Sequence, residues 1–434
     1  MKINWFSPLP PAKTDIANYT QRILKELTKW MDFTLWTTQE KWSKEAIPHI
    51  QINSLKNSKI SWSDLNRADI NVYNIGNNVH FHGDIWRISR ICPGIVTLHD
   101  FKLHHLFGGI YREEEQSKDD YLEQMSKFYG VQGREAGEKF WNCVLDTEYM
   151  ANYYPLTELA LENAIGVVTH TEEAYQMVSR LNRYLVYYVP LPYESKYPKV
   201  DKSIPVPPYR LIVFGFIGAN RRLDSIINAL AQMPEKEQFR LDIYGEISQI
   251  NHIKNQLIKL NLNHLVKIHG FVEESTLDLA LSKADLAINL RYPSMGEASG
   301  SQLRILDHSL PGLVTKVGWY SSLPQDIVSF IDPNQEIEDI KDKLRQFLAN
   351  PKFFIEKGKK GKELLETQHS PKNYVEAISK IVLEAKQYQT IYSSNYLIGK
   401  IGKTVGAWSK SHVENIDINR ISDAVNYLVE PCSK

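Results

Sequence analysis

Short apolar runs alternate with stretches of helical periodicity along the chain, and this alternation occurs twice. The apolar runs expected to form strands are residues 2–7, 33–36, 72–77, 94–100, 165–170 and 184–192, followed by 210–218, 240–245, 266–272, 285–290, 312–318 and 327–332. Strands that alternate with helices pair in parallel, because each helix carries the chain back to the starting edge of the sheet. The sequence therefore predicts an α/β protein with two successive doubly wound domains.

The clearest boundary is residues 193–208 (YESKYPKVDKSIPVPP), which are rich in proline and lysine and show no periodicity. Such a composition is typical of a linker. We expect a first domain at 1–200, a second at 201–388 and a C-terminal helical appendage at 389–434. A length of 434 residues suits two domains and an appendage. Within the appendage, residues 418–429 have the apolar spacing of a helix.

Charge and cysteine content argue against several classes of protein. Lysine plus arginine equals aspartate plus glutamate at 51 each, unlike the basic excess of a nucleic-acid-binding protein. The three cysteines lie far apart without CxxC spacing, so neither a zinc site nor a disulfide framework is expected. The first residues, MKINWFSPLPP, do not resemble a signal peptide, and no stretch approaches the roughly 20 apolar residues of a membrane span. We expect a cytosolic protein, with contact at the inner face of a membrane left open.

A glycine-bearing loop follows the predicted strand 285–290 directly and leads into a predicted helix. It contains Gly296, Glu297, Ser299, Gly300 and Ser301. Free backbone N–H groups at a helix N-terminus can bind an anion, and a nearby carboxylate can accept hydrogen bonds from sugar hydroxyls. The loop therefore suits a sugar carried on a diphosphate. The alternative is that Ser299 only caps the helix and Glu297 only complements its dipole.

The segment 291–324 resembles the family 4 glycosyltransferases, and in particular a subgroup with a GExSG loop and a VGW motif. The matching residues are Gly296-Glu297-Ala298-Ser299-Gly300, Arg304, Pro311, Val317-Gly318-Trp319 and Leu323-Pro324. The resemblance covers most of residues 1–385 and is strongest at 210–324. It implies the two-domain GT-B architecture, with Rossmann-like domains facing a central cleft and the last helix, 418–429, packing back on the first domain.

A second match is FGFIGANRRLDSIINAL at 214–230, where the family has a basic residue after a strand and a glycine. Arg221 takes the place of the family's usual lysine, and Arg222 is beside it. Two arginines could clamp the donor diphosphate; the alternative is a pair of solvated surface charges. The resemblance implies a donor-binding set that also includes Gly215, Gly270, Phe271, Arg304 and Asp15.

The first half of the chain resembles the family as well. Residues 7–20 are similar to the loop that approaches the donor, and His99 corresponds to the histidine that faces the transferred sugar. Asp100 and His170 are further candidates for the cleft, since each lies at a strand end. We interpret the histidines at 104–105 as structural.

Three positions depart from the family pattern. Ile305 stands where many members have a second glutamate for the donor ribose, and Phe216 stands where an arginine is common. Asp15 replaces a glycine of the first loop, which removes conformational freedom and adds a negative charge near the donor.

The implied activity is retaining transfer of a hexose-type sugar from a nucleotide sugar, UDP- or GDP-linked, to a glycan or lipid-linked acceptor. Arg221 would stabilise the leaving diphosphate, Glu297 would hold sugar hydroxyls, and His99 would orient the sugar. The family generally uses no metal, so no metal or cofactor is expected. Two alternatives stay open: a catalytically weak donor-binding partner subunit, suggested by Asp15 and Phe216, and a GT-B nucleotide-sugar 2-epimerase, which would need acidic catalytic groups in the cleft.

Overall fold

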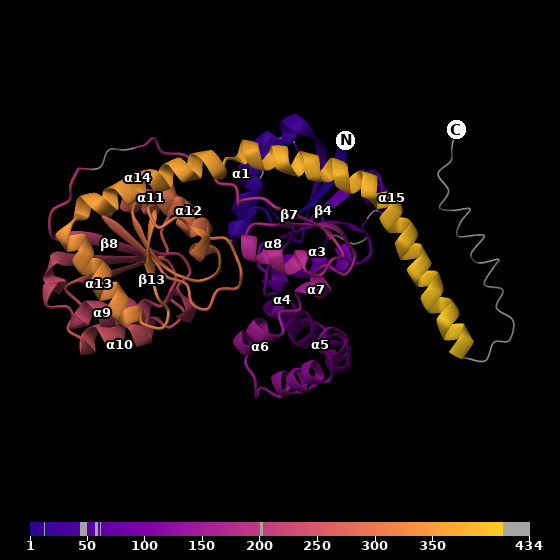
Figure 1. Cartoon of the computed structure of the whole chain (residues 1–434), viewed down its shortest axis with the longest axis horizontal. Coiled ribbons are helices and arrows are strands. Elements are labelled where there is room, and N and C mark those ends of the chain that lie inside the picture. Colours follow the sequence, from indigo (N-terminus) through magenta and orange to yellow (C-terminus); the bar gives the residue numbers. More distant parts are fainter. Residues whose placement is uncertain (13, 44–49, 57–59, 61, 200–202, 411–434) are drawn as a thin grey trace.

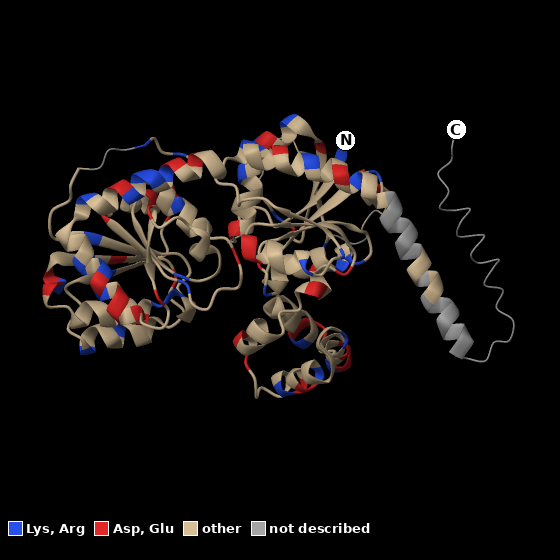
Figure 2. Ribbon diagram, viewed as in Figure 1, with Lys and Arg blue, Asp and Glu red and all other residues tan. Residues whose placement is uncertain are grey.

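The computed structural model describes residues 1–12, 14–43, 50–56, 60, 62–199 and 203–410. These residues form two α/β domains side by side, and a long C-terminal helix crosses from the second domain over the first (Figure 1). Acidic and basic side chains are interspersed over the outer helices of both domains (Figure 2), in keeping with the zero net charge.

The first domain contains a seven-stranded parallel sheet in the order β3-β2-β1-β4-β5-β6-β7. Its strands are β1 (Lys2–Phe6), β2 (Asp32–Thr37), β3 (Gln51–Ser54), β4 (Ile70–Ile75), β5 (Gly94–Leu98), β6 (Ala164–Thr169) and β7 (Leu185–Tyr188). Its helices are α1 (Asp15–Trp30), α2 (Trp62–Leu65), α3 (Val79–Ser89), α4 (His104–Gly108), the π-helix η1 (Gly109–Glu114), α5 (Lys118–Trp141), α6 (Thr147–Tyr153), α7 (Thr157–Ala160) and α8 (Glu172–Ser179). The central strands are buried almost throughout because helices cover both faces of the sheet.

The second domain contains a six-stranded parallel sheet in the order β10-β9-β8-β11-β12-β13. Its strands are β8 (Tyr209–Phe214), β9 (Phe239–Tyr244), β10 (Val266–Gly270), β11 (Leu286–Asn289), β12 (Gly312–Thr315) and β13 (Val328–Ile331). Its helices are the 3-10 turns η2 (Ala219–Arg221), η3 (Pro234–Gln238) and η4 (Gly318–Ser322), with α9 (Leu223–Gln232), α10 (Ile250–Lys259), α11 (Glu274–Lys283), α12 (Gly300–Asp307), α13 (Glu336–Ala349) and α14 (Pro351–Gln368). This strand order is that of a Rossmann fold.

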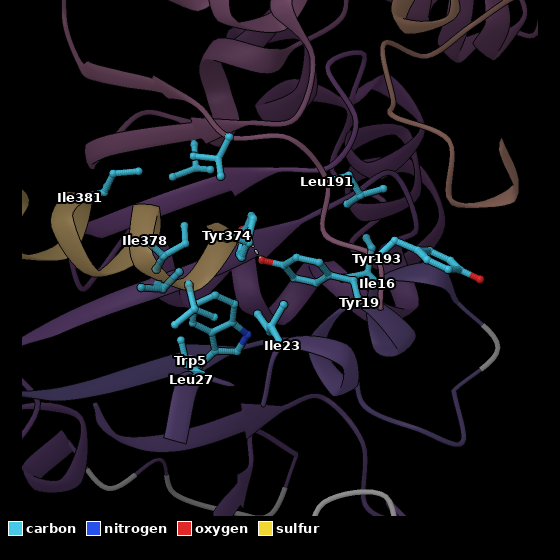
Figure 3. Close-up of a cluster of buried hydrophobic side chains, with 14 of the residues drawn as sticks. Trp5, Ile16, Tyr19, Ile23, Leu27, Leu191, Tyr193, Tyr374, Ile378 and Ile381 are labelled. Carbon is cyan, nitrogen blue, oxygen red and sulfur yellow. Dashed lines mark hydrogen bonds between the residues drawn. The ribbon is translucent and has the colours of Figure 1, made fainter. Parts of the chain in front are cut away.

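Helix α15 (Pro371–Lys410) joins the second domain to the core of the first. Its buried face includes Tyr374, Ile378 and Ile381, which pack in one cluster with residues of β1 and α1 such as Trp5 and Tyr19 (Figure 3). The Tyr19 and Tyr374 hydroxyls are hydrogen-bonded at 2.6 Å. No helix among the described residues is both long and apolar enough to cross a bilayer.

The expected boundary at 388/389 falls inside α15, which continues without interruption from 371 to 410. The part of the chain that packs back on the first domain therefore begins at Pro371, earlier than expected. The predicted helix 418–429 lies outside the described residues. No regular helix or strand occurs in the described part of the predicted linker, 193–199 and 203–208.

Each strand predicted from the sequence is present, but β3 and the helices α3, α10 and α14 were not predicted. Strand β3 reads QINS, a short and half-exposed edge strand without an apolar alternation. Helix α14 contains Gly358 and Gly361, which weaken a helical pattern. A Cβ atom on Gly358 would lie 2.2 Å from the Ser309 carbonyl oxygen, so the glycine is required by close packing against the segment after α12.

The strand order reverses between β1 and β4 in one sheet and between β8 and β11 in the other. In open parallel sheets, ligands bind beyond the carboxyl ends of the strands at such a switch point. The loops that follow these four strands are therefore the place to look for a site.

Candidate functional site

A cavity of about 470 Å³ lies between the two domains. It is lined from the first domain by residues that follow β1, β4, β5 and β6, and from the second by residues that follow β8 and β11. The lining residues used below are Asp15, Tyr19, Asn77, His99, Asp100, His105, Glu148, His170, Asn220, Arg291, Glu297 and Gly300. Both switch points thus contribute to one cavity.

The loop after β11 makes direct contact with the loop after β5. The Met295 carbonyl accepts hydrogen bonds from the backbone N–H groups of Phe101 (3.1 Å) and Lys102 (2.9 Å), and Lys102 Nζ donates to the Ser294 carbonyl at 2.8 Å. Gly296 has φ +80°, and a Cβ atom there would lie 2.6 Å from the Phe101 Cβ. The glycine therefore allows the two domains to approach at the cavity wall.

Glu297 lies on this wall and is held in place by its neighbours. Its Oε2 accepts hydrogen bonds from the Met295 backbone N–H (2.7 Å) and the Ser294 hydroxyl (3.1 Å), while Oε1 is 3.3 Å from Arg291 Nε. One carboxylate oxygen is thus fixed by the backbone, and the other faces a guanidinium in the cavity lining.

Asp100 is a second acid of the same cavity, on the opposite wall. Burial and then the negative charge of Glu297 raise the pKa of Asp100 to about 7. Its Oδ2 accepts a hydrogen bond from the Asn77 backbone N–H at 2.9 Å, which acts in the opposite direction on the pKa. Two carboxyl groups with different environments therefore face one cavity.

Arg221 ends the 3-10 turn after β8 and is buried, with 7% of its surface exposed. Its Nη1 donates to Asn289 Oδ1 (2.6 Å) and its Nη2 to Ser301 Oγ (3.3 Å), while its buried Nε has no hydrogen-bond partner. Burial and then the charge of Arg291 lower the pKa of Arg221 to about 10. The structure therefore holds a desolvated cation whose hydrogen-bond partners are neutral.

Gly215 makes room for this cation. It has φ +109°, and a Cβ atom on it would lie 3.2 Å from Arg221 Nη2. Gly270 (φ +72°) ends β10, and Phe271 follows with 67% of its surface exposed. Neither Gly270 nor Phe271 lines the cavity described above.

The other two arginines of the predicted set point elsewhere. Arg222 adopts a left-handed conformation (φ +56°), and its Nε pairs with Glu336 at the start of α13 at 2.9 Å. Arg304 of α12 packs against α11 and pairs there with Asp278 (2.6 Å) and Glu274 (2.9 Å). Arg291 thus lines the cavity, whereas Arg221 does not: it is buried next to the lining residue Asn220 and is hydrogen-bonded to Ser301.

The N-terminus of α12 opens onto the same cavity through Gly300. Ser299 caps the helix, since its Oγ accepts from the Gln302 backbone N–H at 3.1 Å. Ser301 accepts a hydrogen bond from Arg221. Asp15, at the start of α1, faces this terminus: its Oδ2 is 3.6 Å from the position of a Cβ on Gly300. A carboxylate of the first domain therefore lies at a site that favours anions.

Neutral histidines form the inner wall of the first domain. His99 Nε2 donates to Asn74 Oδ1 at 3.0 Å, and its ring is 4.9 Å from that of His170 and 4.7 Å from that of Tyr19. Burial and then the neighbouring histidines hold the pKa of His99 well below its usual value, and burial lowers the pKa of His170 to about 4. His170 Nδ1 donates to the Val189 carbonyl, and its buried Nε2 has no partner.

Several lining residues were not singled out from the sequence. Arg291 lies two residues beyond the end of β11, but the match to the GExSG loop favoured the residues that follow it. His105 lines the cavity with Glu148, whereas its neighbour His104 is buried between the Tyr154 carbonyl and the Tyr121 hydroxyl. An alternation of buried and cavity-facing positions on a short helix gives no signal in the sequence.

The structure shows the environments of two positions that depart from the family pattern, Ile305 and Phe216. Ile305 is fully buried in an apolar cluster with Ile212, Phe214 and Leu310, so a glutamate at this position would be buried among apolar side chains. Phe216 is exposed beside the loop after β8. No group of three or more His, Cys, Asp or Glu side chains among the described residues is arranged to hold a metal ion.

Residues 199–364, which form most of the second domain, match the family model described as "Glycosyl transferases group 1". No curated protein matched the sequence. The second domain is thus similar to a known glycosyltransferase domain, and the match ends before α15.

Solved structures of low identity share the fold over most of the chain. HepE of Anabaena in complex with UDP and glucose has a TM-score of 0.61 at 13% identity, covering 88% of this chain and 100% of that chain. Sucrose-phosphate synthase of Thermosynechococcus elongatus has a TM-score of 0.61 at 16% identity, covering 88% and 98%. WaaG, a glycosyltransferase involved in lipopolysaccharide biosynthesis, has a TM-score of 0.53 at 15% identity, covering 88% and 99%. These similarities confirm the predicted GT-B fold.

Proposed function

We propose that the chain is a retaining glycosyltransferase that moves a hexose-type sugar from a UDP- or GDP-linked donor to a glycan or lipid-linked acceptor, without a metal or cofactor. The match of residues 199–364 to a glycosyltransferase model supports the reaction class. The structure of HepE with UDP and glucose supports the choice of a nucleotide-sugar donor. The observation that carries the proposal is the buried, incompletely bonded Arg221 beside the N-terminus of α12 and the carboxylate of Glu297.

The anion half of this site suits a diphosphate. Arg221 is already desolvated and fixed by Asn289 and Ser301, so it need not reorganise when negative charge develops nearby. Arg291 adds a second positive charge, and the free N–H groups of α12 add partial charge of the same sign. A phosphate group placed here would stabilise the charged form of Arg221, whose pKa is lowered by burial and then by the charge of Arg291.

The sugar half of the site suits neutral hydroxyl groups. Glu297 can accept hydrogen bonds, and the neutral imidazole of His170 offers an unpaired ring nitrogen close to His99. A neutral ring of this kind can orient a hydroxyl group without adding a charge next to the breaking glycosidic bond.

In this mechanism, the glycosidic bond breaks while the acceptor hydroxyl approaches the same face of the sugar. The departing diphosphate gains negative charge, which Arg221 and the N-terminus of α12 stabilise. A phosphate oxygen accepts the acceptor's proton, so no enzymic nucleophile is needed. The two carboxyl groups of a retaining hydrolase are therefore not assigned.

The test is nucleotide release from a panel of UDP-, GDP- and ADP-sugars with mixed glycan acceptors. The wild-type chain should release nucleotide from one donor class, Arg221→Met and Glu297→Gln should abolish most of that release, and Arg222→Met should not. The anomeric configuration of the product, read by NMR, tests retention. Tight donor binding without release would favour the partner-subunit alternative, and a donor changed at C2 with its nucleotide still attached would favour the epimerase.

A further inference from the structure

Helix α6 lies at the mouth of the cavity, in an insertion that has no part in the sheet. The insertion runs from α4 to α7 between β5 and β6 and forms a lobe beside the first domain (Figure 1). Glu148, in the first turn of α6, lines the cavity. Lys102 Nζ donates to Asn152 Oδ1 in the last turn (2.7 Å) and to the Ser294 carbonyl of the second domain (2.8 Å). One lysine thus fixes α6 beside the loop that carries Glu297.

Two exposed tyrosines occupy the adjoining row of this helix. Tyr149 and Tyr153 are one turn apart and next in sequence to Glu148 and Asn152, so they form a neighbouring stripe on the helix surface. Their ring centroids are 4.6 Å apart with a tilt of 38°, and 41% and 66% of their respective surfaces are exposed. Paired aromatic rings left in water beside a cavity form a ready apolar platform.

Two polar side chains of the cavity lining, Glu148 and His105, lie next to the tyrosine pair. His105 Nε2 lies 3.4 Å from Glu148 Oε1, and the buried Nδ1 of His105 has no hydrogen-bond partner. A ligand bound at α6 would therefore contact the rings of Tyr149 and Tyr153 on one side and the polar groups of Glu148 and His105 on the other. This combination is typical of sites that bind small polar molecules with an apolar face.

Charged groups of both signs surround this part of the cavity, and Glu148 is the one that adjoins the tyrosine pair in α6. Glu148 and Asp100 line the cavity together with the positive Arg22 of α1, and Glu172 and Glu173 begin α8 without lining it. Glu173 Oε2 is 3.5 Å from the position of a Cβ on Gly318, so the Glu173 side chain extends to the second domain. Arg291 lies on the opposite, donor-side wall, whereas Arg22 and Lys102 are positive groups of the first domain.

We propose that the Tyr149–Tyr153 pair is the acceptor platform and that it takes an uncharged sugar ring of a neutral glycan. Sugar rings present C–H groups on one face, which pack against the electron-rich faces of aromatic rings, while their hydroxyl groups would bond to Glu148 and His105. This inference rests on the glycosyltransferase proposal and narrows its acceptor to the neutral class. A uronic-acid or phosphorylated ring on the platform would bring its negative charge next to the Glu148 carboxylate, and such a like-charge contact is unfavourable.

The test is an array of neutral, uronic-acid and phosphorylated oligosaccharides, probed with the full chain in the presence of UDP. Binding should be confined to neutral glycans. For the glycan bound best, Tyr149→Ala and Tyr153→Ala should each weaken binding about three- to tenfold, as expected for losing one ring contact. Tyr149→Phe should retain binding. Tyr388→Ala, which removes an exposed tyrosine of α15, is the matched control and should have no effect.

Nucleotide release from the donor without acceptor separates the two proposals, since the tyrosine variants should leave it unchanged. Absence of binding to any neutral glycan, equal binding of uronic-acid or phosphorylated glycans, or insensitivity to both alanine variants would each overturn the acceptor platform. Absence of nucleotide release by the wild-type chain from every donor tested would instead overturn the glycosyltransferase proposal.

Discussion

Replacing Arg221 with methionine removes the buried charge on which the proposed donor site depends. The substitution keeps the length of the side chain, which packs below Gly215, and eliminates all five N–H donors. In the donor-free protein, only two neutral oxygens, of Asn289 and Ser301, lose their partner. We therefore expect the folded state to survive, with a stability loss of about 1–3 kcal/mol from the unsatisfied polar atoms.

The effect on catalysis should be larger. A hydrogen bond to a charged group contributes about 1.5–3 kcal/mol, and removing one preorganised donor at a developing charge typically costs about 2.7–4 kcal/mol. A loss of about 3 kcal/mol corresponds to roughly a 150-fold fall in kcat/KM for the donor. Arg221→Lys keeps the charge but not the bonding geometry, and should recover about tenfold of this loss.

The neighbouring Arg222 provides the matched control. Because its guanidinium pairs with Glu336 rather than facing the cavity, Arg222→Met should change kcat/KM by no more than about twofold. It should nevertheless lower stability, since Glu336 is 5% exposed at its side chain and loses its partner. The assay is steady-state nucleotide release at 25 °C, with folding checked by thermal denaturation. Equal losses of kcat/KM in both variants, or no loss in folded Arg221→Met, would refute the assignment.

Three further changes test other parts of the structure. Gly296→Ala should lower kcat/KM about tenfold, because its Cβ would meet Phe101 at 2.6 Å and displace the loop that carries Glu297; donor titrations with a folded variant check this. The free energy of unfolding of Asp100→Asn should increase relative to that of the wild type as pH rises from about 4 to 7. The raised pKa means that the folded state keeps a proton that the unfolded state loses in this window, so the wild type loses stability there; melting curves at pH 5 and 8 check the sign. Lys362→Met should destabilise the second domain by about 3–5 kcal/mol, since Lys362 and Asp307 are both fully buried and 2.6 Å apart; chemical denaturation measures it, and an unchanged midpoint would contradict it.

The fold could be predicted because its signals are local. Fully buried strands such as β5, β6 and β12 are short apolar runs, and a polar loop follows each of them. The glycine loop before α12 could be predicted for the same reason, since its capping serine and its glycines serve consecutive residues. Helix α14 could not be predicted in this way. Its Gly358 is required because Ser309, about 50 residues earlier in the chain, packs closely against it.

The candidate site could be predicted only in part, because the direction of a side chain depends on the tertiary fold. Arg221 and Arg222 are adjacent and chemically identical in the sequence. The left-handed conformation of Arg222 turns its side chain to Glu336, while Arg221 is hydrogen-bonded to Asn289 and Ser301. The second cationic group is Arg291, 70 positions later, and only the pairing of β8 with β11 brings it near Arg221.

Asp15, which replaces a glycine of the family pattern, lies opposite the N-terminus of α12 in the structure. A glycine at this position would leave the N-terminus of α12 open to the cavity, whereas the aspartate places a carboxylate opposite Gly300. Its negative charge partly offsets the fall in the Arg221 pKa that burial and Arg291 cause. Donor binding in this chain would therefore exchange one anion for another at the same helix terminus. The affinity for the proposed donor would then depend on how far α1, which carries Asp15, moves from α12 when phosphate enters.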